Sequence, residues 1–351
     1  MTENRGEVKP LVSILIPAYN AQQWLRETLR SAIAQTWERK EIIIVDDGSK
    51  DDTLSIAKEF EGDGVQVFTQ QNQGAAAARN RAFSLSHGDY IQWLDADDLL
   101  GPDKIPLQME ALAKKGAGCR TLLSSSWGRF LHDPNRAVFT PTALWDSLSP
   151  VDWLVRKMGQ NLYMQTATWL VSREVTEAAG PWDTRLLGDD DGEYFCRVLL
   201  ASESVLFVPE AKVYYRSSGA GSLSYVGRSD RKMEAQWLSM QKHVAYVRSL
   251  EDSERVRAAC VKYLENWLVA FYPARMDLVA NSQALARELG GELRLPRLSW
   301  KYAWIEAAFG RFFAWRAQLF LLGLRWKIDN SLDKAMFRTM KAADSLRVRR
   351  A

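Results

Sequence analysis

Four short polar segments follow one another in the first part of the chain, and each lies at or beside the end of an apolar run. They are Pro17-Ala18-Tyr19-Asn20, Asp46-Asp47-Gly48-Ser49, Asn72-Gln73-Gly74 with Arg79-Asn80 behind it, and Asp95-Ala96-Asp97-Asp98. In open α/β sheets, ligands bind beside the carboxyl ends of the strands. The order therefore predicts one site that combines carboxylates, a glycine and an arginine. Carboxylate oxygens suit a hard divalent cation such as Mg²⁺, which indicates a site for a metal-bound nucleoside diphosphate.

The apolar runs beside these segments predict strands that alternate with helices. Residues 11–16 and 41–45 are rich in β-branched residues, which is typical of strands buried on both faces of a parallel sheet. Further strands are expected at 65–68 and 90–94. Helices are expected at 24–33, from a capping box at 49–52 to residue 60, and at 74–86. This alternation indicates a nucleotide-binding α/β architecture.

The rest of the chain has a different composition. After Leu123 we expect mixed strands and longer loops, with late strands at 205–208 and 212–215. From Arg228 onward, glycine, proline and β-branched residues become rarer and helical composition dominates, with breaks at Gly290-Gly291 and Pro296. We therefore predict an α/β domain with a mostly parallel central sheet over residues 1–227, followed by a helical C-terminal domain over residues 228–351.

Cysteine and histidine chemistry is not indicated. The three cysteines, Cys119, Cys196 and Cys260, lie far apart, so we expect neither a disulfide framework nor a zinc site, which fits a reducing compartment. The three histidines show no metal or triad spacing, so base catalysis would fall to carboxylates. The run at 11–16 is too short for a signal sequence, and no uncharged run is long enough to span a membrane. We expect a cytoplasmic chain, or one peripheral to the inner membrane face, with no nucleic-acid partner.

Asp95 and Asp97 stand two residues apart at the end of the predicted strand 90–94. If the extended path continues, both side chains point to the same side. A divalent cation, Mg²⁺ or Mn²⁺, would offset the repulsion of two such carboxylates and link them to a diphosphate. The alternative is a solvated acidic turn before Pro102.

Asp47 and Arg79 are the candidates for nucleotide contacts. Asp47 follows a predicted strand, where its carboxylate can accept a hydrogen bond from a base N–H group. The guanidinium of Arg79, on the helix after Gly74, can reach a pyrimidine carbonyl or a phosphate. The alternatives are an ordinary turn at Asp47 and a surface arginine at position 79.

The four segments together resemble the family 2 glycosyltransferases with the GT-A fold, over roughly residues 10–225. The sequences that carry the resemblance are PAYN, VDDGS, NQGAAAARN and WLDADD. The resemblance implies an inverting enzyme that uses a metal-dependent nucleotide-sugar donor. It also implies that Pro17 and Tyr19 line the nucleobase pocket, where Asp47 and Arg79 contact the base. Asp97 would be the principal ligand of the metal or diphosphate, with support from Asp95.

The family's catalytic base lies in a later acidic motif, and residues 187–197 (LGDDDGEYFCR) occupy that place. Placing Arg197 on the family's helix arginine puts Asp190 at the glutamate of the motif and Asp191 at the base. The register stays ambiguous by one residue, and Glu193 is a further candidate. Crowded carboxylates should raise at least one pKa, which suits a proton acceptor. Alternatively, these acids only favour the dipole of a helix N-terminus.

Two further features depart from or add to this pattern. Many family members carry a histidine where this chain has Ser218, so its task would fall to Arg216, to Ser218 or to neither. Trp182, Trp169 and Trp127 would form a sugar-stacking wall or belong to the core, and Trp182 is the preferred wall residue.

Charge is distributed unevenly along the chain. Residues 1–227 carry 23 Lys and Arg against 30 Asp and Glu, whereas residues 228–351 carry 23 against 13. The stretch 300–327 is dense in aromatic and basic residues. Its alternatives are a packed helical subdomain or homodimer surface, and an interfacial segment on anionic lipid. We interpret the helical half as the part that locates a glycan or lipid-linked acceptor.

The predicted function is transfer of a sugar from a nucleotide donor, UDP-linked by preference, to an acceptor hydroxyl in cell-surface or lipid-linked glycan synthesis. One alternative is a degenerate member that binds sugar nucleotide or a partner without turnover. A sugar nucleotidyltransferase is the other, but the chain lacks a glycine-rich basic phosphate loop after its first strand.

Overall fold

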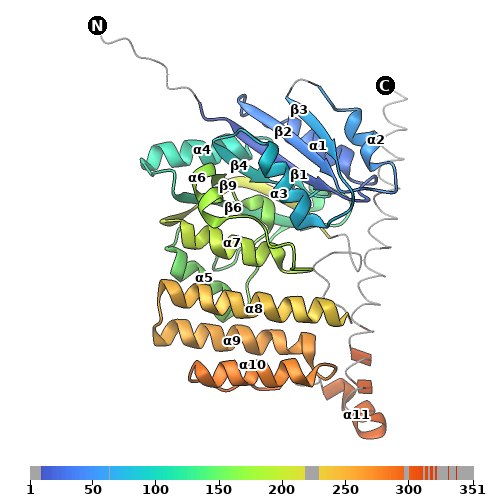
Figure 1. Cartoon of the computed structure of the whole chain (residues 1–351), viewed down its shortest axis with the longest axis vertical. Coiled ribbons are helices and arrows are strands. Elements are labelled where there is room, and N and C mark those ends of the chain that lie inside the picture. The colour runs from blue at the N-terminus through green and yellow to red at the C-terminus, as the bar shows by residue number, and fades with distance from the viewer. Residues whose placement is uncertain are drawn as a thin grey trace.

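The computed structural model describes residues 9–62, 64–217, 229–295 and 300–310, with a few further positions between 313 and 337. Two sheets and the helices packed on them form one part, and three long helices are stacked beneath it (Figure 1). The strands are β1 Val12–Ala18, β2 Lys40–Asp46, β3 Val65–Thr69, β4 Tyr90–Trp93, β5 Leu99–Leu100, β6 Thr121–Phe130, β7 Val138–Phe139, β8 Val171–Ser172 and β9 Ser204–Arg216.

Helices connect and cover these strands. The α-helices are α1 Leu25–Ile33, α2 Thr53–Lys58, α3 Ala75–Leu85, α4 Lys104–Lys115, α5 Pro150–Gln160, α6 Arg173–Ala179, α7 Asp190–Ala201, α8 Asp230–Leu250, α9 Glu254–Phe271, α10 Met276–Glu288 and α11 Ala303–Phe309. Short 3₁₀ turns are η1 Pro134–Arg136, η2 Thr166–Thr168 and η3 Trp300–Tyr302. None of the helices within the described ranges combines the length and the apolar composition needed to span a bilayer.

The first sheet has the strand order β3-β2-β1-β4-β8, and its first three pairings are parallel. Ile14, Leu15, Ile43 and Ile44 are fully buried, because helices cover the sheet and leave no exposed face for polar residues. The predicted parallel strands are confirmed. Only the edge strand β8 runs antiparallel. Parallel pairing brings the ends of β1, β2 and β4 to one edge of the sheet, as the order of the polar segments predicts.

The second sheet has the order β5-β9-β6-β7 and mixes parallel and antiparallel pairs. The strands predicted at 205–208 and 212–215 are in fact one strand, β9. Its pairing with β6 shifts register between Ser125 and Ser126. Pro209 lies in the skipped part of β9, and a proline has no N–H to donate to the ladder, so a bulge accommodates it. The strand then continues to Arg216.

The predicted capping box is wrong. Helix α2 begins at Thr53, and its N-cap Asp52 makes no side-chain capping bond. The Ser49 hydroxyl accepts a hydrogen bond from the Asn20 backbone N–H at 3.0 Å instead, and Asp52 N–H donates to Gln22 at 3.1 Å. Ser49 and Asp52 therefore form hydrogen bonds with the β1–α1 loop and not a capping box within α2. These bonds link the β1–α1 loop to the β2–α2 loop.

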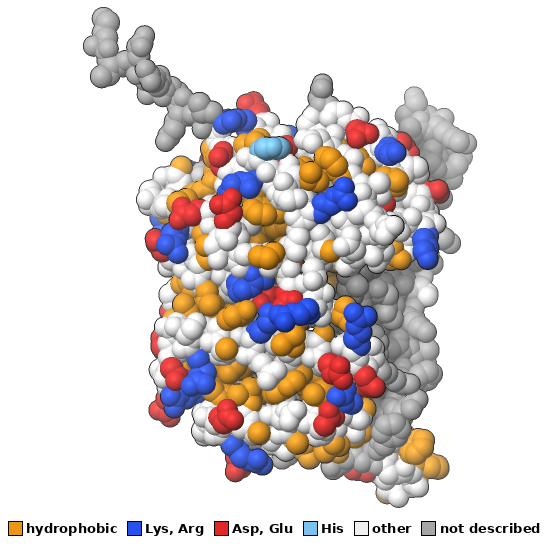
Figure 2. Space-filling model, viewed as in Figure 1, with side chains coloured by type: hydrophobic (Ala, Val, Ile, Leu, Met, Phe, Trp, Pro, Cys, Tyr) orange, Lys and Arg blue, Asp and Glu red, His pale blue; other side chains and the backbone are white. Residues whose placement is uncertain are grey.

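The long helices share a core with the sheets. One cluster of buried residues contains Leu15 and Ile43 of the first sheet together with Val244 of α8 and Leu264 of α9. In Figure 1, α8 lies directly beneath α7, with α9 and α10 below it. Figure 2 shows acidic and basic side chains gathered where α7 and α8 meet. In the stretch 300–327, on which the lipid and dimer alternatives rest, the structure describes residues 300–310 and five later positions, and the others lie outside the described residues.

Candidate functional site

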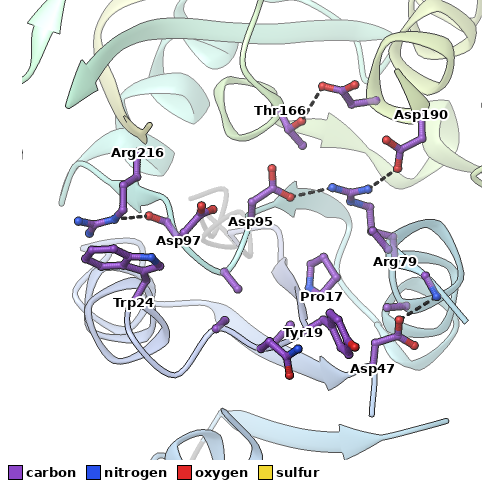
Figure 3. Close-up of a pocket in the computed structure, with 18 of the residues that line it drawn as sticks. Pro17, Tyr19, Trp24, Asp47, Arg79, Asp95, Asp97, Thr166, Asp190 and Arg216 are labelled. Atoms are coloured by element: carbon purple, nitrogen blue, oxygen red, sulfur yellow. Dashed lines mark hydrogen bonds and ion pairs between the residues drawn. The ribbon is translucent and has the colours of Figure 1, made fainter. Parts of the chain in front are cut away.

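A pocket of about 570 Å³ opens at the strand ends of the first sheet. Every predicted catalytic, nucleotide-binding and metal-binding residue except Glu193 lines it, as does Arg216. Those lining residues are Pro17, Tyr19, Asp47, Arg79, Asp95, Asp97, Asp190, Asp191 and Arg216. Figure 3 shows Pro17, Tyr19 and Asp47 at one side, with Asp95 and Arg79 between them and the acidic segment. Segments more than a hundred residues apart in sequence thus form one site.

The Asp47 carboxylate is held in place by the loop before α3. One oxygen accepts from the Gln70 amide at 2.7 Å and from the Gln73 N–H at 2.9 Å, and the other accepts from the Gly74 N–H at 2.8 Å. Gly48 has φ +70, and a Cβ there would come within 2.9 Å of the Asn72 backbone nitrogen, so the tight turn requires glycine. Asp47 therefore lines the pocket and also fixes the loop before α3.

Arg79 connects two carboxylates across the pocket. Its guanidinium donates to Asp95 at 2.8 Å and to Asp190 at 2.7 Å (Figure 3). Burial opposes the charge on Arg79, but Asp95 and Asp190 outweigh burial and raise its pKa. The interpretation of Arg79 as a free surface arginine is therefore wrong, because the side chain is buried and paired. In this structure it links the end of β4 to the start of α7.

The indole ring of Trp182 packs against the guanidinium group of Arg79. The guanidinium carbon lies 4.4 Å from the centre of the Trp182 ring, and this ring stacks on Tyr194 at 3.9 Å. Trp182 is only 2% exposed and does not line the pocket. The prediction of a sugar-stacking wall from Trp182, Trp169 and Trp127 is therefore wrong for the main pocket. Trp24, at the start of the helix predicted at 24–33, does line it.

The chain turns sharply at Asp95–Asp98, so the extended path assumed for Asp95 and Asp97 does not continue. Strand β4 ends at Trp93, and the Asp98 N–H donates to the Asp95 carbonyl at 3.1 Å. Both side chains still line the pocket. Asp98 points into the protein, where it accepts from the Arg216 N–H at 2.8 Å. Burial first, and then the nearby Asp97 and Asp95, raise the pKa of Asp98 well above its usual range.

Arg216 enters the pocket from the end of β9. Its guanidinium lies 4.1 Å from the centre of the Trp24 ring, donates to the Asp97 carbonyl at 2.9 Å and pairs with Glu27 at 2.7 Å. These contacts fix a cation beside Asp97, where a phosphate group could meet it. Ser218, the other candidate for this task, lies outside the described residues.

The three aspartates before and in the first turn of α7 have different surroundings. Asp190 pairs with Arg79, whereas Asp189 turns toward α8 and accepts from Ser239 at 2.6 Å. Asp191 accepts from the Gly192 N–H at 2.9 Å and contacts Thr166 at 3.5 Å. In the part of the chain that the structure describes, Asp191 forms no ion pair. Among the described residues, Asp191 therefore faces the pocket with no cationic partner, whereas Asp189, which also lines the pocket, has His243 Nδ1 3.7 Å from its carboxylate.

Burial raises the pKa of Asp191 to about 7, and the neighbouring Asp190 and Asp189 add to the shift. The prediction that this cluster raises at least one pKa is confirmed. Burial is the largest cause, although like charge alone had been expected. A carboxylate with a pKa near neutrality holds a proton more strongly than an ordinary one, which is the property of a general base.

Glu193 does not belong to the pocket. Its carboxylate is fully buried between α7 and α8, where Arg197, Lys242 and Tyr246 all donate to it. Burial alone would raise the pKa of Glu193, but these donors outweigh burial and lower it. Glu193 is therefore held in its ionised form as part of the core, so the proposed site omits it.

Asp95 and Asp97 are the residues of the pocket that could hold a divalent cation. No group of three or more His, Cys, Asp or Glu residues is arranged around one point within the described ranges. Asp95 and Asp97 offer two carboxylates to the same pocket. Mg²⁺ is commonly bound through one or two carboxylates together with substrate phosphates and water. The donor set therefore fits a cation that arrives with a diphosphate.

Comparison with known proteins finds a family that this part of the chain resembles. Residues 13–151 match the family model described as glycosyl transferase family 2. The predicted resemblance to the family 2 glycosyltransferases is confirmed over these residues. The matched segment includes β1, β2 and β4, whose ends build one side of the pocket, and stops before the acidic segment at α7.

The chain spans only part of the length of the curated relatives that it matches. An uncharacterised glycosyltransferase of Rickettsia typhi is 46% identical over 105 residues, which are 30% of this chain and 33% of that protein. Chondroitin synthase of Escherichia coli is 43% identical over 107 residues, which are 30% of this chain and 16% of that protein. The match therefore spans a third or less of these relatives.

Among solved structures, residues 1–349 of S. aureus TarS superpose on this chain with a TM-score of 0.60 at 16% sequence identity, and the alignment covers 80% of each chain. At such low identity the likeness shows the fold. The chain has the expected GT-A-like α/β fold, and the alignment extends beyond the segment that the family model matches.

Proposed function

We propose that the chain is an inverting glycosyltransferase that moves a sugar from a nucleoside diphosphate donor to an acceptor hydroxyl. The observation that carries this proposal is the position of Asp191, a carboxylate with its pKa raised to about 7, in the same pocket as Asp95 and Asp97. The pocket thus offers a proton acceptor together with ligands for a metal-bound diphosphate.

The donor would lie across the pocket floor. Tyr19 and Pro17 form an exposed wall beside Asp47, where a flat nucleobase can stack and donate to the carboxylate. A UDP-linked donor is preferred, since the TarS fragment has been solved with UDP and with UDP-GlcNAc. The diphosphate would lie toward Asp95 and Asp97, with Arg216 near the phosphate charge.

Asp97, supported by Asp95, would hold a divalent cation together with the diphosphate. When bound, this cation supplies charge neutralisation for the departing nucleoside diphosphate. Asp191 would accept the proton of the acceptor hydroxyl while the oxygen of that hydroxyl attacks the anomeric carbon from the side opposite the diphosphate. A single displacement of this kind inverts the anomeric configuration.

Nucleotide release separates this proposal from its alternatives. The purified chain is incubated with a panel of UDP- and GDP-sugars and a mixture of glycan acceptors, with and without Mn²⁺. We expect one donor to release its nucleoside diphosphate in an acceptor- and metal-dependent way. Binding without release would indicate a degenerate member, and release of pyrophosphate from a nucleoside triphosphate and a sugar phosphate would indicate a nucleotidyltransferase.

The pH profile provides an independent check on Asp191. A base acts only when ionised, and the pKa of Asp191 is raised to about 7, so activity should fall as pH drops below this value. We expect an acidic limb in kcat/KM, which reports the free enzyme, with a midpoint near 7. A midpoint near the ordinary aspartate value of about 4 would contradict the role of buried Asp191 as the base.

A further inference from the structure

A polar face of α8 lies against the acidic segment that carries Asp191. Gln236, Ser239 and His243 are spaced so that they share one side of this helix, and all three are buried. Ser239 donates to the Asp189 carboxylate at 2.6 Å, and Gln236 reaches the same oxygen at 3.4 Å. Buried polar side chains on a helix that also packs on a hydrophobic core need such partners.

Asp189 has an unusual backbone conformation that this contact stabilises. Its φ of 55° lies in the left-handed region, which is uncommon for a residue other than glycine. Its carboxylate fills the space beside Gly192, where any Cβ would collide with it. The bend at Asp189 sets the direction in which α7 begins, and Asp191 is the second residue of that helix.

The support extends behind Ser239. His243 Nδ1 lies 3.2 Å from the Ser239 hydroxyl and 3.1 Å from the Tyr263 hydroxyl of α9. On the other side of Asp191, Glu193 is held by Lys242 and Tyr246, which also belong to α8. Helix α8 therefore fixes the residue two positions before Asp191 and the residue two positions after it.

We propose that Ser239 is a positioning residue for the reaction: by holding Asp189 in its bent conformation, it orients α7 so that Asp191 faces the acceptor hydroxyl. This inference rests on the proposed role of Asp191 as the base. Ser239 touches neither donor nor acceptor, so its effect should appear in the chemical step. Small misplacement of a reacting group lowers the rate strongly, because productive geometry is narrow.

The test compares Ser239→Ala with Ser282→Ala in the full chain. Both serines are buried in the long helices, but within the described ranges the Ser282 hydroxyl bonds only the Leu278 carbonyl of its own helix, at 2.8 Å. We expect Ser239→Ala to lower kcat about 10-fold with the donor KM unchanged, and Ser282→Ala to leave both constants unchanged. Ser239→Cys, which keeps the size and a weak donor, should fall between wild type and Ser239→Ala.

A double-mutant cycle shows whether Ser239 acts through Asp189. Asp189→Gly removes the carboxylate and tolerates the positive φ. If the two residues act as a unit, the losses in kcat for Asp189→Gly and Ser239→Ala will not add in the double variant. Additive losses, an equal loss in Ser282→Ala, or a kcat for Ser239→Ala within twofold of wild type would each overturn the inference.

Two measurements distinguish failure of the positioning role from loss of folding and from failure of the proposed base. Circular dichroism at the assay temperature confirms that each variant is folded, and Ser239→Cys replaces Ser239→Ala if the latter is not. Asp191→Asn is assayed in parallel. If Asp191→Asn remains active, the proposed role of Asp191 as the base fails. If Asp191→Asn is inactive while both Ser239 variants keep the wild-type kcat, only the positioning role is excluded.

Discussion

Asp191→Asn is expected to lower sugar transfer by about 10²–10⁴-fold, the loss typical of removing a general base. Asparagine has nearly the same shape as aspartate but cannot take up the acceptor proton. Donor binding should be unchanged, because the proposed donor contacts lie on β1, β2, β4 and β9. The measurements are kcat with a saturating donor and the dissociation constant of the nucleoside diphosphate with Mn²⁺.

Two neighbouring carboxylates serve as controls for this assignment. Asp190→Asn removes one partner of Arg79, and Glu193→Gln weakens a buried contact with α8, so both should cost less activity than Asp191→Asn. If Asp190→Asn or Glu193→Gln were the more damaging change, the register of the acidic motif would be wrong. Near-normal turnover in all three variants would rule out a carboxylate base in this segment.

Asp97→Asn is expected to weaken metal-dependent binding of the nucleoside diphosphate by roughly 10- to 100-fold, since it removes a charge-assisted contact worth about 1.5–3 kcal/mol. Asp95→Asn should act in the same direction, and it also leaves Arg79 with one carboxylate fewer. Both side chains face the pocket, so the fold should survive. Calorimetric titration with and without Mn²⁺ measures the effect.

Asp98→Asn is the matched control for that series. Asp98 belongs to the same turn but is buried and accepts from the Arg216 N–H. Its substitution should therefore mainly lower the melting temperature. Unchanged nucleotide affinity with Mn²⁺ in Asp97→Asn would contradict the assignment of Asp97. Loss of folding in Asp97→Asn would show that its main role is structural.

The strands and their order could be predicted because local patterns determine them. Runs such as those at 11–16 and 41–45 are apolar except for Ser13 and Glu41, and a sheet covered on both sides buries such runs completely. Once the strands are parallel, their carboxyl ends meet at one edge, and the polar residues that follow each strand come together there. This is why Pro17, Tyr19 and Asp47 were placed correctly beside one another.

The contacts within the site could not be predicted from the same patterns. Spacing cannot show that Arg79 pairs with Asp190, which lies 111 residues further along the chain. It also cannot show that Trp182 stacks on Tyr194 in the core, because an aromatic residue beside an acidic motif fits a sugar wall equally well. Asp98 looked like a member of the acidic motif, and only the turn at 95–98 directs it away from the pocket.

The helical C-terminal part has a further role that composition did not predict. Composition separated residues 228–351 from the α/β part and suggested that they help to locate the acceptor. In the structure, α8 and α9 share a hydrophobic core with the sheets, and α8 holds Asp189 and Glu193. A boundary in composition is therefore not a boundary in packing, and the helices support the segment that carries the proposed base.

The most direct measurement is a crystal structure of the full chain with UDP and Mn²⁺, with anomalous difference data that locate the manganese. The account predicts the uracil ring beside Tyr19 and Asp47, and one manganese between the diphosphate and Asp97, with Asp95 nearby. Asp191 should remain within the open end of the pocket, where an acceptor would enter. A nucleotide bound outside this pocket, or a diphosphate in the pocket with manganese away from Asp95 and Asp97, would contradict the account.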